Sequence, residues 1–98
     1  MSRVFSMTTM RNQEHRLFLA QEADALSKEY GRIVNRERVR LNLSIRELAQ
    51  RADLEPIYIR ELENATTLRS PTLEVMFRIA RPLKRHPAEL LPISGGVQ

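Results

Sequence analysis

The side chains that could perform catalysis or hold a metal ion are few in this chain and poorly spaced for either task. His15 and His86 lie far apart, the sequence contains no cysteine, and no metal-ligand spacing occurs. Nucleophile-elbow, phosphate-loop and paired-carboxylate signatures are also missing. His86 precedes Pro87 where a helix cap belongs, so we expect it to be structural. We therefore expect no enzyme activity, no cofactor and no metal ion.

Charge and composition indicate what the chain could bind instead. Its 98 residues carry a formal net charge of +4, a balance common among nucleic-acid-binding domains, although a solvated arginine-rich face produces it too. The lack of cysteine suits a reducing cytoplasm. No apolar run approaches the ~20 residues of a bilayer span, and the first residues are too polar for a signal peptide. We expect one small cytoplasmic domain with no membrane partner.

The most specific pattern runs from Ser44 to Glu63 and predicts two short helices joined by a tight turn. Ser44 and Glu47 have the spacing of a capping box, in which each side chain accepts a hydrogen bond from the other residue's amide. Asp53 stands where the turn favours a left-handed residue, which Asp tolerates. Glu55-Pro56 opens the second helix, because proline suits a first helical turn. Such a unit can place one helix in the major groove of DNA.

Apolar spacing predicts the remaining elements. A helical period extends from Asn12 to Leu41, and Gly31 either weakens one long helix or separates two helices. Leu73 to Arg81 is expected to form a further helix that ends before Pro82. A last short helix is expected to start at His86-Pro87. Within the central pair of helices, the residues expected to point inward are Leu48, Ala49, Ala52, Ile59 and Leu62.

Four short motifs follow one another along the chain. They are Leu43-Ser44 with Glu47-Leu48-Ala49, Tyr58-Ile59 with Leu62-Glu63-Asn64, Ser70-Pro71 before a helix containing Ile79-Ala80, and Leu83 with Pro87 and Leu90-Leu91. In this order and spacing they resemble the helix-turn-helix family of lambdoid phage repressors, Cro proteins and xenobiotic-response-element (XRE) transcriptional regulators. The resemblance covers about Tyr30 to Leu91. It implies an all-α fold, a five-helix lambda-repressor-like helix-turn-helix domain with an extra N-terminal helix.

The expected organisation has three parts. Residues 1–28 form an N-terminal arm and the extra helix, residues 29–91 the helix-turn-helix DNA-binding domain, and residues 92–98 a flexible tail. The segment from Leu17 to Leu26 carries the apolar residues Leu17, Phe18, Leu19 and Leu26 and lies outside the core that the resemblance covers. It could pack back onto the domain, or supply contacts for a dimer or another partner.

The resemblance also implies how the domain would contact DNA. The start of the Ser44 helix would touch phosphates, and the helix from Glu55 to Asn64 would read base edges. Arg46 and Arg69 are the best phosphate ligands by charge. The residues nominated for DNA binding are Ser44, Ile45, Arg46, Glu55, Pro56, Ile57, Tyr58, Arg60, Glu61, Arg69 and Ser70.

For two arginines, Arg38 and Arg60, a specific role can be stated. The resemblance implies a buried structural ion pair between Arg38 and Glu63, against the alternative of two surface charges. The guanidinium fork of Arg60 matches the O6 and N7 acceptors of guanine, although a helix salt bridge with Glu63 is an equal alternative. A basic cluster near the C-terminus is expected to be solubilising rather than to flank DNA, and it comprises Arg78, Arg81, Lys84 and Arg85.

The head of the reading helix departs from the pattern of the family, whose members often carry Ser, Thr or Gln there. Glu55 would be repelled by phosphates unless it accepts a hydrogen bond from a cytosine amino group, and Ile57 offers only apolar contact. Ile45 occupies a position that is often a polar phosphate contact. Either specificity depends on few contacts and on DNA shape, or this face binds protein.

The function that the resemblance implies is a sequence-specific transcriptional regulator, a homodimeric repressor of the Cro/C1 type that binds a palindromic operator in double-stranded DNA. The alternative is an antitoxin or adaptor. In that case the helix-turn-helix domain or the N-terminal helix would hold a protein partner such as a toxin.

Overall fold

Helices account for all the regular structure in the part of the chain that the computed structural model describes, which is residues 2–66 and 70–92, with side chains from residue 14 onward. The elements in order are α1 (Ser2–Arg40), α2 (Ile45–Ala52), α3 (Pro56–Glu63), α4 (Leu73–Ala80) and a 3₁₀ turn, η1 (Pro87–Leu90). The prediction of an all-α helix-turn-helix fold is therefore confirmed at this level. None of the helices in the described ranges has both the length and the apolarity that a membrane span requires.

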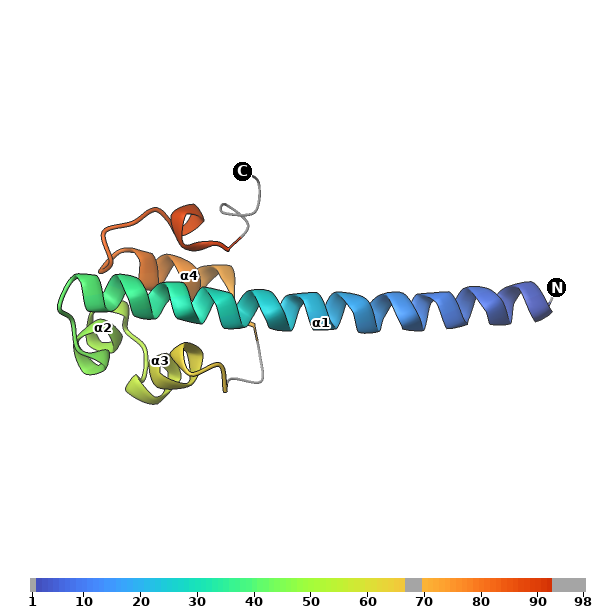
Figure 1. The fold of residues 1–98 in the computed structure, drawn as a ribbon, viewed down its shortest axis with the longest axis horizontal. Helices are drawn as coiled ribbons and strands as arrows, with labels where there is room; N and C mark the ends of the chain where they lie inside the picture. The colour runs from blue at the N-terminus through green and yellow to red at the C-terminus, as the bar shows by residue number, and fades with distance from the viewer. Residues whose placement is uncertain (1, 67–69, 93–98) are drawn as a thin grey trace.

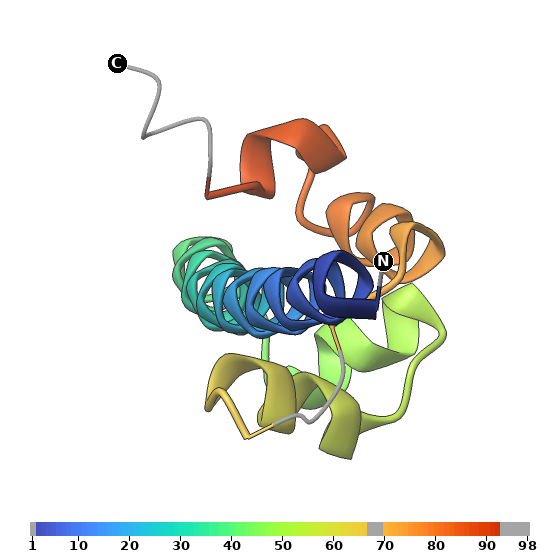
Figure 2. The same cartoon turned by 90° about the vertical axis from the view of Figure 1, so that its right-hand side faces the viewer.

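Helix α1 determines the overall shape of the molecule. Its 39 residues would extend for about 58 Å at 1.5 Å per residue, close to the 60 Å longest dimension of the molecule. Only its C-terminal part is embedded in the domain, with α3 on one side and η1 on the other, and the remainder projects beyond the other helices (Figures 1 and 2). The molecule is thus a small helical domain with a long rod attached to it.

The core lies where the last three turns of α1 meet the shorter helices. Each helix contributes residues at three- and four-residue spacing, so that one stripe of every helix faces the same centre. The inward residues predicted for α2 and α3 are all buried. The core side chains of the described region are Tyr30, Ile33, Val34, Leu43, Leu48, Ala49, Ala52, Ile59, Leu62, Ile79, Ala80, Leu83 and Leu90.

The extra N-terminal helix is not a separate element, because α1 passes through Gly31 without a break. Glycine costs a helix only about 1 kcal/mol relative to alanine, which the flanking turns tolerate. Gly31 has another role: a Cβ atom built there would collide with the backbone carbonyl of Leu62 and lie 2.9 Å from its carbonyl carbon. The glycine therefore lets α3 cross α1 at close range.

The C-terminal end of the domain also differs in detail from the expectation. Helix α4 ends at Ala80, two residues before Pro82, and the last predicted helix is the 3₁₀ turn η1. Its cap is His86, whose Nδ1 accepts a hydrogen bond from the Ala88 amide at 3.1 Å, so His86 is structural as predicted. The described region thus contains four α-helices and one 3₁₀ turn rather than five helices plus an extra one. Of the predicted tail, residues 93–98 lie outside the described residues.

Candidate nucleic-acid interface

The N-terminus of α2 is closed by a complete capping box. The Ser44 hydroxyl accepts a hydrogen bond from the Glu47 amide, the Glu47 carboxylate accepts one from the Ser44 amide, and both distances are 2.9 Å. These bonds with Ser44 lower the pKa of Glu47, which keeps the carboxylate charged. The Ser44 hydroxyl can still donate its own hydrogen to a phosphate oxygen outside the helix. Arg46, two residues further on, is exposed.

The turn between α2 and α3 depends on Asp53, which adopts the left-handed conformation that the sequence predicts, with φ of 57° and ψ of 48°. The chain then reverses, and the Leu54 amide donates to the Ala49 carbonyl at 2.9 Å. Arg78 of α4 donates to the Asp53 carbonyl at 3.2 Å and lies 3.7 Å from its carboxylate. The turn is therefore fixed both by its own backbone and by α4.

Helix α3 presents one face to the core and the other to solvent. Glu55 is its N-cap and makes no side-chain capping bond, and Pro56 occupies the first helical position. Ile59 and Leu62 are fully buried and anchor the helix from behind. The outward side chains are exposed, and they are Glu55, Ile57, Arg60, Glu61 and Asn64.

The C-terminal end of α3 is tied to α1 through the carboxylate of Glu63. Arg38 donates to both carboxylate oxygens, from Nε at 2.7 Å and from Nη2 at 2.9 Å, and Asn35 donates a third hydrogen bond at 2.8 Å. The Arg38 and Glu63 side chains are only 13% and 4% exposed. The remaining Nη1 group of Arg38 donates to the Leu43 carbonyl at 2.7 Å. One arginine thus joins α1, the turn before α2 and the end of α3.

A second buried carboxylate, Glu37, joins α1 to the segment after α4. Arg85 and Arg40 donate to its Oε1 atom at 2.9 and 3.0 Å, and Arg36 lies 3.5 Å from Oε2. Burial raises the pKa of Glu37, but the hydrogen bonds from Arg85 and Arg40 outweigh it, so the net pKa lies below its ordinary value. Sequence reasoning missed the pairing of Arg85 with Glu37 and the burial of this carboxylate. Its signal was a carboxylate placed four residues after Ile33, on the buried stripe of α1.

The sequence-nominated residues fall into three groups. Ser44, Arg46, Glu55, Ile57, Arg60 and Glu61 are exposed along the start of α2 and the outer face of α3. Ile45 and Tyr58 are half-buried and pack against the core, and Pro56 is half-buried too. Ser70 is exposed and its hydroxyl accepts a hydrogen bond from the Ser27 hydroxyl at 2.9 Å, whereas Arg69 lies outside the described residues.

The basic cluster near the C-terminus is divided between structural and exposed side chains. Arg78 pairs with Asp53 and with Glu74, and Arg85 pairs with Glu37 and Glu89. Within the described residues Arg81 and Lys84 have no ion-pair partner and are exposed. Half of the cluster therefore serves to hold the fold together.

Helix α3 is short and firmly held, and it can present the exposed guanidinium group of Arg60 to a groove of a nucleic acid. Within the described part of the chain, Arg60 has no ion-pair partner, because Arg38 and Asn35 occupy the Glu63 carboxylate that could have held it. Helix α3 is supported from behind by core contacts, at its start by the turn and at its end by the Arg38 pair. Such support leaves the outer face free to contact another molecule.

When the chain is compared with known proteins, it matches one family model, and its fold is similar to that of a solved structure. A family model described as helix-turn-helix matches residues 34–90. Among solved structures, the chain is similar to the crystal structure of the clp gene regulator ClgR from Corynebacterium glutamicum, with 24% sequence identity, a TM-score of 0.65 and coverage of 74% of each chain. At this identity the similarity establishes the fold alone. No curated protein matches the chain.

Proposed function

The chain belongs to the helix-turn-helix family of DNA-binding transcriptional regulators, and we propose that it is a homodimeric repressor that binds a palindromic operator in the cytoplasm. The observation that carries this proposal is the outward face of α3, on which Arg60 is exposed and without an ion-pair partner in the described region. With α3 in the major groove, Arg60 donates two hydrogen bonds to guanine, and Ile57 contacts a thymine methyl group. The proposed role is binding and needs no cofactor.

The phosphate contacts in this proposal come from the start of α2. Arg46 supplies positive charge and Ser44 a hydroxyl donor, and both are exposed beside the first amides of the helix, where anions bind favourably. In the proposed complex Ser70 lies near the DNA backbone, and Arg69, which is outside the described residues, is nominated by its charge alone. Glu55 and Glu61 are repelled by phosphates, so the proposed interface has few favourable contacts and depends on DNA shape as well.

The proposed dimer uses the projecting part of α1. The buried stripe of Tyr30 and Ile33 continues outward through Leu26, Ala23 and Leu19, at spacings of three and four residues. Leu19 and Leu26 are exposed in the single chain. Because an isolated helix gains most of its stability from packing, a rod of this length is best explained by a second copy of the same helix packed against it.

A protein partner is the second candidate, and the exposed run of Leu17, Phe18 and Leu19 favours it. Three consecutive apolar side chains exposed at 65%, 56% and 50% are unusual unless something covers them. In that case the partner of the rod would be a different protein, such as a toxin. The same chain could bind DNA through α3 at the same time.

The experiment that tests the DNA proposal selects an operator from random duplexes and then compares two arginine variants on it. The selected site should bind with a Kd of roughly 10⁻⁸ to 10⁻¹¹ M and weaken steeply with salt. Arg60→Ala should relax the preference at one base position and cost about 1–3 kcal/mol. Arg46→Ala should weaken all duplexes alike and lower the salt slope by about one.

A matched control is Arg36→Ala. Arg36 is exposed and lies about 140° around α1 from Gly31, the point at which α3 crosses, so operator affinity should not change. If Arg60→Ala and Arg46→Ala caused equal losses on every duplex, Arg60 would not be a base reader. If no duplex were enriched, the operator proposal would be wrong.

A further inference from the structure

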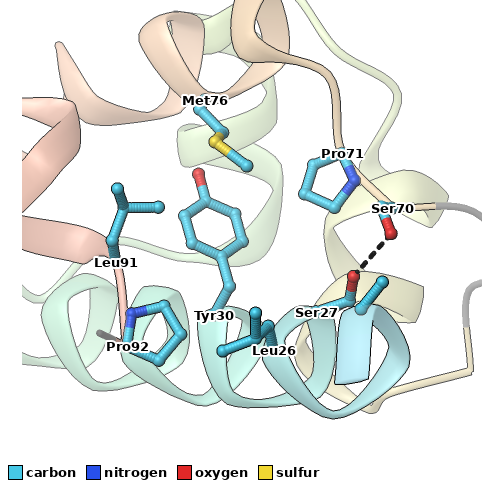
Figure 3. Close-up of a pocket in the computed structure, with 9 residues that line it drawn as sticks. Leu26, Ser27, Tyr30, Ser70, Pro71, Met76, Leu91 and Pro92 are labelled. Carbon is cyan, nitrogen blue, oxygen red and sulfur yellow. Dashed lines mark hydrogen bonds between the residues drawn. The ribbon is translucent and has the colours of Figure 1, made fainter. Parts of the chain in front are cut away.

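Two features of the described surface lie outside the proposed DNA interface. One is a mostly apolar hollow beside Leu26 and Met76 (Figure 3), which has no charged side chain in its described wall and so selects no particular occupant. The other is a group of arginines around the buried carboxylate of Glu37, which we call the Glu37 cluster. Its arginines are Arg36, Arg40 and Arg85. A cluster of this kind selects its partner by charge and by hydrogen-bond geometry.

The carboxylate of Glu37 holds two of these arginines close together. Arg40, the last residue of α1, and Arg85, in the segment after α4, both donate through Nε to its Oε1 atom, at 3.0 and 2.9 Å. Because both lie within 3.0 Å of one oxygen, the two Nε atoms are at most about 6 Å apart. Arg36 is the third member, with its Nε atom 3.5 Å from Oε2. Since Glu37 is buried, its carboxylate is a fixed anchor for the three guanidinium groups.

The anchoring contacts leave the outer ends of the guanidinium groups free. A guanidinium group has five N–H donors, of which Nε supplies one. In the described region the Nη groups of Arg36 and Arg40 have no hydrogen-bond or ion-pair partner, and both side chains are exposed. Arg85 uses Nη1, which lies 3.3 Å from Glu89, and keeps Nη2 free. Arg36 and Arg40 also lie one turn apart on α1, where like charges repel each other.

The charges around the cluster do not balance. The carboxylates of Glu37 and Glu89 are the negative groups that pair with the three arginines in the described region. Lys84, next to Arg85 in the sequence, is exposed and adds a fourth positive charge without an ion-pair partner among the described residues. Four positive and two negative side chains leave an excess of two positive charges, which an anion would neutralise.

The cluster faces away from the proposed DNA interface. Arg40 lies nine residues after Gly31, which is about 180° around α1 from the point at which α3 crosses. Helix α3 and η1 also lie on opposite sides of α1 (Figures 1 and 2). A duplex bound by α3 would therefore not reach these arginines.

We propose that the Glu37 cluster is a binding site for the phosphate group of a small molecule. A phosphate monoester carries a charge of about −1.5 to −2 at neutral pH and three accepting oxygens, which match the charge excess and the free Nη donors. Arginine forks bind such oxygens in pairs. Guanidinium groups held together by one carboxylate suit one compact anion better than an extended row of charges. Binding requires no DNA, so the proposal is independent of the operator.

The test titrates inorganic phosphate into the whole ¹⁵N-labelled chain without DNA, and repeats the titration with chloride at the same ionic strength. The reporter is the NMR signal of the Arg85 Nε–H group, identified by its absence in Arg85→Gln. Phosphate should shift this signal in a saturable manner, and chloride should not. Arg40→Gln should weaken phosphate about tenfold, the usual contribution of a hydrogen bond to a charged group. Arg40→Lys, which keeps the charge but not the fork, should cause a smaller loss.

The matched control is Arg32→Gln, because Arg32 is an exposed arginine of the same helix that pairs with Glu29. It should leave the phosphate affinity nearly unchanged. Equal shifts with phosphate and chloride would indicate general screening and would exclude the site. Equal losses from Arg40→Gln and Arg32→Gln would exclude it as well. If a duplex without the operator displaced phosphate and moved the Arg85 signal at lower concentration, the surface would bind nucleic acid and the small-molecule proposal would be wrong.

Discussion

The contribution of an ion pair to the stability of this protein depends on how deeply the pair is buried, and not only on the distance between its charged atoms. The Arg38–Glu63 and Arg32–Glu29 pairs both have closest N–O distances of 2.7 Å. The first pair is almost fully buried and the second is largely exposed, with side-chain exposures of 65% and 48%. Water and salt screen the exposed pair, whereas the buried carboxylate depends on its protein donors.

Arg38→Ala should therefore lower the free energy of unfolding by about 3–5 kcal/mol, because it leaves the Glu63 charge buried with Asn35 as its remaining side-chain donor. The measurement is chemical denaturation at neutral pH. Arg32→Ala is the matched control and should cost less than about 1 kcal/mol. A loss of that small size from Arg38→Ala would mean that the pair behaves like a surface pair.

At the level of single residues, the sequence predicts contacts between near neighbours in the chain, but not contacts between residues far apart in it. The capping box of Ser44 and the left-handed Asp53 could be predicted because spacing or local turn chemistry specifies them. The bonds from Asn35 to Glu63 and from Arg85 to Glu37 could not, since they join residues 28 and 48 positions apart. The pairing of Arg38 with Glu63 came from the resemblance to a family and not from the pattern of this chain.

At the scale of elements, the crossing of α1 and α3 depends on a missing side chain. The sequence suggested that Gly31 weakens or interrupts a helix, and nothing in the spacing pointed to Leu62, which lies in a different helix. The structure shows a continuous α1 with the α3 backbone directly over the glycine. Helix bounds were predictable from caps and prolines, but the reason for this glycine required the packed fold.

Gly31→Ala should destabilise the protein even though alanine is the better helix former. The gain in helix propensity is about 1 kcal/mol, but the added methyl group collides with a backbone carbonyl that no rotamer change can move. Displacing α3 should give a net loss of about 1–3 kcal/mol, the usual cost of overpacking.

Thermal or chemical unfolding measures the loss, and Arg32→Ala at the adjacent exposed position serves as the propensity control. Operator affinity should fall as well, because α3 carries the proposed reading face. A Gly31→Ala protein as stable as the wild type would show that α3 can move away at no cost.

At the scale of the whole molecule, one continuous helix serves two regions with different surroundings. Near its C-terminal end the apolar stripe of α1 is covered by α3 and the other short helices, and toward its N-terminal end the same stripe is exposed. The periodicity of the sequence predicted the helix, but not its continuity or its projection.

The exposed stripe leads to a prediction about assembly. Leu19 lies on the stripe, whereas Leu17 lies about 200° away around the helix, so the two leucines point to opposite sides of α1. Leu19→Glu should weaken the proposed dimer on the order of a hundredfold or more, since each copy loses a buried leucine and gains a charge. Leu17→Glu, the same change on the other side, should leave the dimer intact. Light scattering over a concentration series, with and without operator, measures both. A wild-type chain that remains monomeric throughout would exclude this dimer, and the apolar side chains of α1 would then have to be covered by a different protein.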